Sequence, residues 1–99
     1  MIRPQISKAA CQDLDAIAEY FLTRNIDAGE RFFQEFNQKC KYLVNFPFIG
    51  KSYPSISNGL RGLPIQGYII LYLVTKDNQL EIVRVVNGRQ DLENLFNEN

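Results

Sequence analysis

The sequence predicts an α+β fold in which an antiparallel helix hairpin packs on one face of a small, mostly antiparallel sheet. The expected order is β-α-α-β-β-β, followed by a short C-terminal helix or tail. Two consecutive segments between residues 8 and 46 carry apolar side chains at helical spacing, and three segments between residues 60 and 86 have strand patterning. With 99 residues, 45% hydrophobic and 22% charged, the chain suits one globular domain over residues 1–99.

The first two elements are a short strand and a helix. Residues 2–6 alternate apolar and polar side chains, and Pro4 leaves one side of this strand without a hydrogen-bond donor. Ser7 is suited to cap a helix over residues 8–24. The apolar side chains of that helix recur at helical offsets, which indicates one buried face: Ala10, Leu14, Ile17, Ala18, Phe21 and Leu22.

The second helix is expected from Asp27 to Phe46. Asp27 and Glu30 have the spacing of a capping box, in which the Asp27 side chain accepts a backbone N–H. Phe46 precedes Pro47, and the residue before a proline is pushed out of the helical region. One stripe of this helix is apolar, which predicts its buried face: Ala28, Phe32, Phe36, Cys40 and Leu43.

Three strands follow a loop over residues 48–59. Residues 60–63 suit a short strand, residues 64–67 a turn, and residues 68–74 a central strand that is apolar on both faces. Residues 75–78 suit a hairpin connection and residues 80–86 the last strand. Because the helix pair can cover only one face of this sheet, we expect the other face to be open to a partner.

Composition excludes several classes of function. Eleven basic and eleven acidic residues give zero net charge, which argues against a general nucleic-acid binder but leaves room for a local basic site. Histidine is absent, which removes the commonest general base and metal ligand. Because the start does not resemble a signal peptide and no apolar run approaches the roughly 18 residues of a membrane span, we expect a cytoplasmic protein without membrane contact.

No cofactor or metal site is expected. Asp13, Asp15 and Glu19 suit a solvated helix face better than a metal site, because Asp13 points away from the other two. Cys11 and Cys40 are too few for a zinc site. A disulfide between them is geometrically conceivable, but two free, buried thiols are the favoured interpretation.

Many positions along nearly the whole chain share a specific order and spacing: Ser7, Ala9, Asp13, Leu14, Ile17, Tyr20, Ala28, Phe32, Leu43, Pro47, Gly50, Leu60, Arg61, Pro64, Tyr68, Ile70, Tyr72, Ile82, Arg84, Val85, Gly88, Arg89, Asp91, Leu92 and Phe96. In these positions the chain resembles the RelE/ParE superfamily of toxins from bacterial type II toxin–antitoxin systems. Its helix pair and its ending are more similar to the ParE-like branch.

The resemblance implies a cognate antitoxin as partner and two alternative targets. The ParE-like branch inhibits DNA gyrase, whereas the RelE-like branch is a ribosome-dependent endoribonuclease that cleaves mRNA with basic residues on an exposed sheet face. Many relatives have histidine where this chain has Asn87, so a decayed toxin that only binds its antitoxin is a third alternative. The leading hypothesis is a ParE-like gyrase inhibitor that is not an enzyme.

Three basic residues are the catalytic candidates of the ribonuclease alternative. Arg84 interrupts an apolar strand, so it must pair with a carboxylate, for which Asp91 and Glu81 are candidates, or open onto solvent or a ligand. Arg61 is expected on an adjacent strand, where two guanidinium groups could bind one phosphate. Lys51 is a candidate general base or acid, although a solvated loop lysine is the more ordinary interpretation.

The partner-binding candidates lie on the last two strands and on the tail. Residues 91–96 have apolar side chains at helical offsets among acidic ones, which suits packing on the sheet or docking of a protein. Tyr68 and Tyr72 share one strand face, which we expect to be the open one. The full set of candidates is Tyr68, Tyr72, Arg84, Arg89, Leu92, Leu95 and Phe96.

Overall fold

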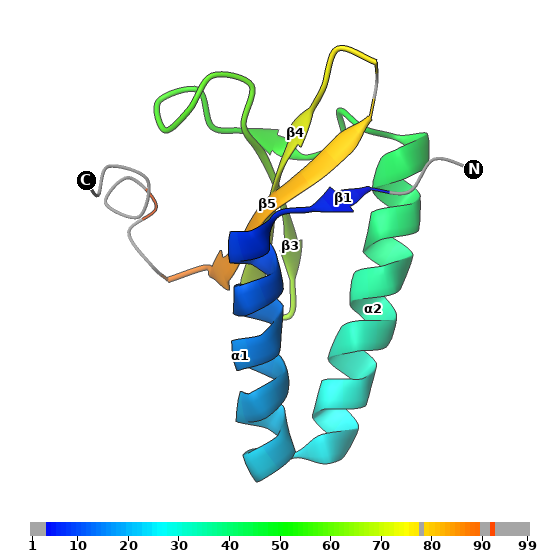
Figure 1. The fold of residues 1–99 in the computed structure, drawn as a ribbon, viewed down its shortest axis with the longest axis vertical. Coiled ribbons are helices and arrows are strands. Elements are labelled where there is room, and N and C mark those ends of the chain that lie inside the picture. The colour runs from blue at the N-terminus through cyan, green and yellow to red at the C-terminus, as the bar shows by residue number, and fades with distance from the viewer. Residues whose placement is uncertain (1–3, 78, 90–91, 93–99) are drawn as a thin grey trace.

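Two helices pack against a five-stranded sheet in the computed structural model, which describes residues 4–77, 79–89 and 92 (Figure 1). In chain order the elements are β1 (Gln5–Ile6), α1 (Lys8–Arg24), α2 (Ile26–Asn45), β2 (Lys51–Ser52), β3 (Arg61–Ile65), β4 (Tyr68–Val74) and β5 (Leu80–Asn87). The strands lie in the order β1-β5-β4-β3-β2, with β1 parallel to β5 and the other pairs antiparallel. The predicted α+β class is confirmed. The two-residue strand β2, inside the segment predicted as a loop, is an additional element.

Helix α1 begins and ends where the sequence predicts. The Ser7 side-chain oxygen accepts a hydrogen bond from the Ala10 N–H at 3.0 Å and so satisfies one of the free donors of the first turn. Neither helix in the described part of the chain is long and apolar enough to cross a membrane.

The two helices are joined through a single residue, Asn25, which caps both. Its backbone N–H donates to Phe21 O at 2.7 Å, and its side-chain oxygen accepts from the Ala28 N–H at 3.1 Å. The predicted cap at Asp27 is therefore wrong, and Asp27 lies in the first turn of α2. The extended backbone of Asn25 explains the difference, because it turns the chain before Asp27 is reached.

The β3–β4 hairpin has a two-residue turn. Gln66 and Gly67 have φ angles of 46° and 83°, as such a tight turn requires. The predicted turn over residues 64–67 is too long, since Pro64 and Ile65 belong to β3. Pro64 is tolerated there because β2 pairs only with Arg61 and Gly62 at the start of β3, so no strand pairs with Pro64 on that side.

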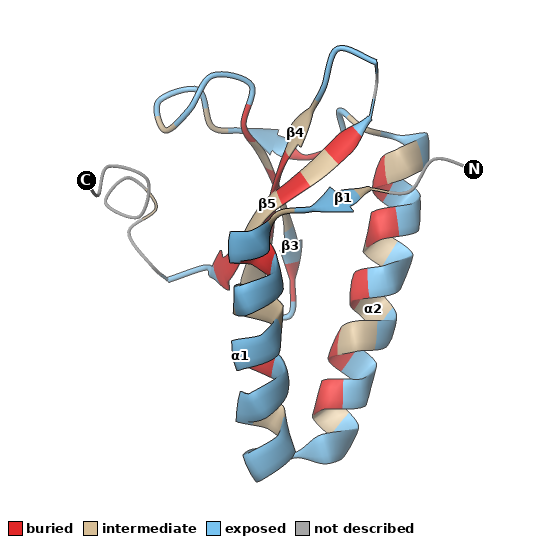
Figure 2. Ribbon diagram, viewed as in Figure 1, coloured by how far each residue is buried: buried red, intermediate tan, exposed pale blue. Residues whose placement is uncertain are grey.

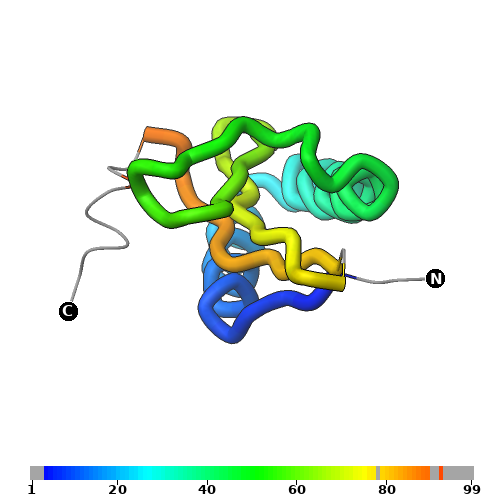
Figure 3. Tube along the Cα trace, turned by 90° about the horizontal axis from the view of Figure 1, so that it is seen from above, coloured from blue at the N-terminus to red at the C-terminus, as the bar shows by residue number. Residues whose placement is uncertain are grey.

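The sheet has an apolar cluster on each face. The residues of the helix-side cluster come from both helices and from β3, β4 and β5, and their burial is visible in Figure 2: Ala10, Ile17, Phe32, Phe36, Cys40, Leu43, Ile65, Ile70, Tyr72, Leu80, Ile82 and Val85. The second cluster contains Leu60, Leu71 and Val86, with Tyr53, Ile56 and Leu92 packed against it. The expectation of an open second face is therefore wrong, because loop 53–60 and Leu92 cover it. Seen from above, this loop lies across the sheet from α1 (Figure 3).

A β-bulge interrupts the pairing of β4 with β5. Leu71 pairs with Arg84 but Tyr72 pairs with Ile82, so Val83 is the extra residue. The bulge allows Ile82 and Val85 to contact the same cluster although they are an odd number of positions apart. Strict alternation would place Arg84 on one face with Leu80, Ile82 and Val86, but because of the bulge Leu80 and Ile82 belong to the helix-side cluster and Val86 to the second cluster.

Candidate functional site

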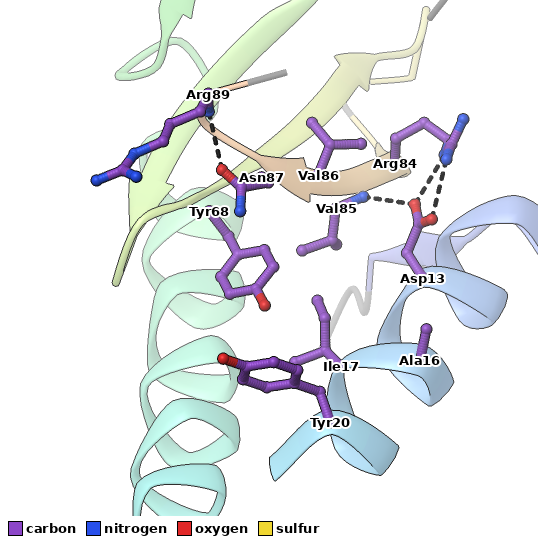
Figure 4. A pocket seen from close by; sticks show the side chains of 10 residues that line it. All are labelled: Asp13, Ala16, Ile17, Tyr20, Tyr68, Arg84, Val85, Val86, Asn87 and Arg89. Carbon is purple, nitrogen blue, oxygen red and sulfur yellow. Dashed lines mark hydrogen bonds and ion pairs between the residues drawn. The ribbon is translucent and has the colours of Figure 1, made fainter. Parts of the chain in front are cut away.

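Helix α1 and the C-terminal half of β5 enclose a groove of about 580 Å³, which we call the α1–β5 groove (Figure 4). Tyr20 of α1 and Tyr68 of β4 extend toward one another across it. The groove is lined by Asp13, Ala16, Ile17, Tyr20, Tyr68, Arg84, Val85, Val86, Asn87 and Arg89. Three of the predicted partner-binding residues, Tyr68, Arg84 and Arg89, thus lie around one concave surface.

Asp13 is the carboxylate that neutralises Arg84. Its Oδ2 accepts from Arg84 Nε at 2.7 Å and its Oδ1 accepts from a terminal guanidinium nitrogen at 2.9 Å, which gives a bidentate pair. The side chains of Arg84 and Asp13 are only 26% and 16% exposed. Glu81, one of the two expected partners, is therefore not the partner in this pair, and Asp91, the other, lies outside the described residues.

The same carboxylate completes the edge of β5. β1 pairs only with Glu81 and Ile82, so β5 needs other hydrogen-bond partners beyond them. Ser7 Oγ donates to Val83 O at 2.7 Å, and Asp13 Oδ2 accepts from the Val85 N–H at 2.9 Å. The first turns of α1 thereby protect an edge that would otherwise be open to another strand.

At the end of β5 the chain leaves the sheet through a turn fixed by Asn87. The Asn87 side-chain oxygen accepts from the Arg89 N–H at 2.9 Å, a local bond that asparagine forms readily. Arg89 is exposed at the rim of the α1–β5 groove. Asn87 therefore has a conformational role at the end of β5.

Tyr72 is fully buried on the helix side and joins β4 to the segment after α2. Its hydroxyl accepts from the Gly50 N–H at 2.9 Å and donates to Pro47 O at 2.8 Å. Burial raises the pKa of Tyr72, although the Gly50 hydrogen bond and the Arg61 charge lower it in part. Tyr72 and Tyr68 do share a face, but the helices cover that face. Tyr68 packs edge-on against Phe32 at 5.4 Å between ring centroids.

Arg61 is bound to the same segment. Its guanidinium donates to Phe48 O at 3.1 Å and to Gly50 O at 2.8 Å, and lies 5.2 Å from the Phe48 ring centroid. Lys51 is exposed, with Nζ 5.4 Å from the Tyr53 ring centroid. Arg61 and Lys51 lie on the paired strands β3 and β2, but Arg61 is opposite Ser52 and Lys51 is opposite Gly62, so the two side chains are not cross-strand neighbours.

Arg61 and Arg84 do not form the expected pair. β4 lies between β3 and β5, so the expectation of adjacent strands is wrong. Their cross-strand neighbours, Tyr72 and Leu71, belong to clusters on opposite faces of the sheet. One guanidinium binds carbonyls of the loop after α2 and the other binds α1, so the two do not converge on one phosphate.

The cysteines are both free. Cys40 is buried, and burial raises its pKa from 9.0 to about 11. Cys11 is exposed, so the expectation that both thiols are buried is wrong for this one. Within the described ranges no group of three potential metal ligands is found.

The tail is described only at Leu92, which packs against the second cluster. Leu95 and Phe96, two of the partner-binding candidates, lie outside the described residues, as does Asp91.

The sequence contains one signal that would have found the Asp13–Arg84 pair. Asp13 falls on the stripe that includes Ala10, Leu14 and Ile17, which are buried or half-buried in the structure. A carboxylate on a core-facing stripe requires a cation or several N–H donors nearby. Arg84 is a basic residue in the middle of an apolar strand, so each of the two residues calls for a partner such as the other.

The chain was compared with known protein families, and one family model matches most of its length. Residues 5–92 match the family model described as "ParE toxin of type II toxin-antitoxin system, parDE". The chain belongs to this family. The match spans β1 to Leu92 and so includes both helices and all five strands.

Individual relatives also match most of the chain. The chain is 27% identical over 89 residues to "Toxin ParE1" of two Mycobacterium tuberculosis strains, CDC 1551 / Oshkosh and ATCC 25618 / H37Rv, covering 89% of this chain and 91% of each relative. A solved structure, "Chromosomal ParDE TA system from P. aeruginosa", has 21% sequence identity and a TM-score of 0.71. It covers 88% of this chain and 96% of that one, which shows a shared fold.

Proposed function

We propose that this ParE-family toxin inhibits growth by binding DNA gyrase and is neutralised by a cognate antitoxin. The observation that carries the proposal is the family match over residues 5–92, which includes every element that forms the α1–β5 groove. Inhibition by binding requires surfaces rather than a catalytic constellation, and the groove supplies one concave surface with aromatic and basic residues at its rim.

The positions of the arginines support a binding function over RNA cleavage. A ribonuclease that acts by 2′-hydroxyl attack needs cations that converge on the reacting phosphate, together with a base and an acid. Arg61 is bound to two carbonyls and Arg84 to Asp13, and the chain has no histidine to act as base. Both arginines have structural partners that account for their place in apolar strands.

An antitoxin partner is part of the proposal. The relative of known structure is described as a ParDE toxin–antitoxin system, and the family is defined by the same pairing. Antitoxin segments that fold on their toxin bury a large surface when they bind. Coexpression of the two genes followed by affinity purification through a tag on one protein tests this pairing, and two separately eluting proteins would contradict it.

The target is tested by pulse labelling soon after the chain is induced alone. We expect thymidine incorporation to fall before methionine incorporation, because gyrase inhibition stops DNA synthesis first. Purified toxin should then inhibit supercoiling of relaxed plasmid by gyrase. An earlier fall in methionine incorporation would contradict gyrase as the target and support the ribosomal ribonuclease. Unchanged growth would leave a decayed toxin.

Arg61→Lys and Arg84→Lys are the matched variants for the ribonuclease alternative. Each keeps the charge but loses guanidinium geometry, so a nuclease that depends on these groups should lose toxicity in both. Because both arginines also stabilise the fold, circular dichroism and thermal unfolding must first show that each variant is folded at the growth temperature. Folded variants that remain fully toxic would support the binding function.

A further inference from the structure

The net charge is zero, but acidic and basic residues are distributed unevenly along the chain. No Asp or Glu occurs from Phe36 to Lys76, whereas the same stretch contains Lys39, Lys41, Lys51, Arg61 and Lys76. This stretch includes the second half of α2, the following loop and the strands β2, β3 and β4. This stretch of the sequence is therefore purely basic, although Glu35 and Glu81 from outside it lie against Gln66 and Leu73.

Large apolar side chains are exposed within that basic stretch. Tyr42, Phe46, Phe48 and Ile49 are 44%, 54%, 60% and 51% exposed. The rings of Tyr42 and Phe46 pack at 5.0 Å between centroids, and the Ile49 N–H donates to Phe46 O at 3.2 Å, so these residues are contiguous. We call these four residues, together with the exposed Lys41 and Lys51 that flank them in the sequence, the aromatic–basic patch; Lys51 Nζ lies 5.4 Å from the Tyr53 ring centroid at its border.

The backbone under this patch is held by the side chains of Tyr72 and Arg61, which we call the brace. Tyr72 bonds to Pro47 and Gly50, and Arg61 bonds to Phe48 and Gly50. Four hydrogen bonds therefore fix the loop between α2 and β2 from beneath while its apolar side chains point outward. A surface fixed in advance loses little conformational entropy when a partner binds.

We propose that the aromatic–basic patch binds an acidic segment of the antitoxin that carries apolar side chains. This inference rests on the proposed antitoxin pairing and adds where and by what chemistry the antitoxin docks. The bidentate Arg84–Asp13 pair is the one ion pair found among the described residues, so Lys41 and Lys51 have no acidic partner in that part of the chain. A carboxylate-rich segment would supply the missing charges, and apolar side chains would cover the exposed rings.

The patch suits a flexible protein segment better than nucleic acid. One face of the Phe48 ring is already covered by Arg61, and Tyr42 and Phe46 pack on each other, so few ring faces remain for base stacking. Ile49 is aliphatic and adds apolar surface that a base cannot use. Segments that fold on binding are rich in charge, so carboxylates of such a segment can meet the lysines while its few apolar side chains cover the exposed rings. A rigid, basic and apolar surface complements an acidic segment of that kind.

The patch is also separate from the α1–β5 groove. In Figures 1 and 3 the C-terminal end of α2 and the C-terminal end of β5 lie on different sides of the molecule. The two surfaces share none of their residues. An antitoxin segment on the patch would therefore leave the groove available to another part of the same antitoxin or to the target.

The test uses the full chain and the protein encoded beside it, coexpressed, separated and recombined in a calorimetric titration. Phe46→Ser with Phe48→Ser removes the apolar contacts, and Lys41→Glu with Lys51→Glu reverses the charge. Leu22→Ser with Ile26→Ser is the matched apolar control, since these side chains are 68% and 58% exposed at the other end of the helix hairpin. Lys8→Glu, in the first turn of α1, is the charge control.

We expect each double patch variant to raise Kd at least about tenfold, as truncation of interface hot spots does, and the controls to change Kd less than about threefold. Raising salt should weaken wild-type binding more than binding by the charge-reversed variant. Because the mutated side chains are largely exposed, folding should be unaffected, and the two patch variants test the surface by independent chemistry.

Other outcomes would contradict the inference in distinguishable ways. Undiminished antitoxin affinity in both patch variants would overturn the inference alone, since the pairing itself would stand. Patch variants that keep the antitoxin but lose RNA cleavage, gyrase inhibition or self-association would assign the patch to nucleic acid, target or a second copy instead. A wild-type chain that binds no such antitoxin would overturn the proposed function together with the inference.

Discussion

Asp13 and Arg84, which are 71 positions apart in sequence, form a bidentate ion pair that joins the first helix to the last strand. The pair does more than neutralise charge, because the same Asp13 oxygen that binds Arg84 Nε at 2.7 Å also accepts the Val85 N–H at 2.9 Å. One carboxylate therefore forms an ion pair with Arg84 and also accepts a backbone hydrogen bond from the β5 edge beside the bulge.

We expect Asp13→Asn to lower the free energy of unfolding by about 1–3 kcal/mol. The neutral amide loses the charge that pairs with Arg84, and its NH₂ group would face at least one of the three N–H donors that the Asp13 carboxylate accepts. Urea unfolding followed by circular dichroism measures the loss. The control is Asp15→Asn, an exposed neighbour on the same helix, which should change stability by less than about 0.5 kcal/mol. Equal effects of the two substitutions would contradict the structural role of Asp13.

We expect Tyr72→Phe to destabilise the fold by about 1–3 kcal/mol, because the Gly50 N–H loses its acceptor and Pro47 O loses a donor. The ring volume is kept, so the change isolates the hydroxyl. Thermal and urea unfolding measure the effect, and Tyr42→Phe, at an exposed tyrosine, is the matched control. If the brace supports the aromatic–basic patch, Tyr72→Phe should also weaken antitoxin binding although it lies outside the patch.

Local signals predicted the helices well. The Ser7 cap and the spacing of Ala10 and Ile17 give α1 its observed bounds, and Pro47 ends α2 where expected, because these signals act within a few residues of the chain. The α2 start was missed because Asn25 and Asp27 are both suitable caps and the extended backbone of Asn25 decides between them. Periodicity alone could not make that choice.

Long-range features escaped prediction for a different reason. β2 exists only through its pairing with Arg61 and Gly62, and the bulge at Val83 exists only through the register of β5 on β4. The second sheet face was expected to be open because the helix pair covers only one face, but Tyr53, Ile56 and Leu60, in and beside the segment predicted as a loop, cover it. The errors about Arg84 and about the open face both follow from these non-local contacts.

We expect Gly29→Ala to destabilise the helix hairpin by about 1–2 kcal/mol, although alanine has the higher helix propensity by about 1 kcal/mol. A Cβ at this position would lie 2.7 Å from Phe21 Cβ, an atom that cannot move without the α1 backbone. Urea unfolding measures the change. Glu30→Ala, at the exposed neighbouring position, is the control and should be nearly neutral. A stabilised Gly29→Ala protein would contradict the close approach of α1 and α2.

The two thiols should differ in reactivity and in their effect on stability at high pH. Under native conditions near pH 8 we expect Ellman's reagent to modify only Cys11, with both thiols reacting in denaturant and none reacting natively after Cys11→Ser. Burial raises the Cys40 pKa from 9.0 to about 11, so the thiol ionises in the unfolded chain first. Stability attributable to this group is complete below pH 9 and is lost as pH rises toward 11.

Between pH 9 and 11 the free energy of unfolding should fall by at most about 1.4 kcal/mol per pH unit, because the unfolded state binds one proton fewer than the native state. Urea unfolding under reducing conditions at pH 8 and just below pH 10 measures it, since the raised Tyr72 pKa adds a loss in the same direction only at higher pH. Cys40→Ala should be less stable at pH 8 but should show a weaker decline between the two pH values. An identical decline in wild type and Cys40→Ala would show that another group is responsible.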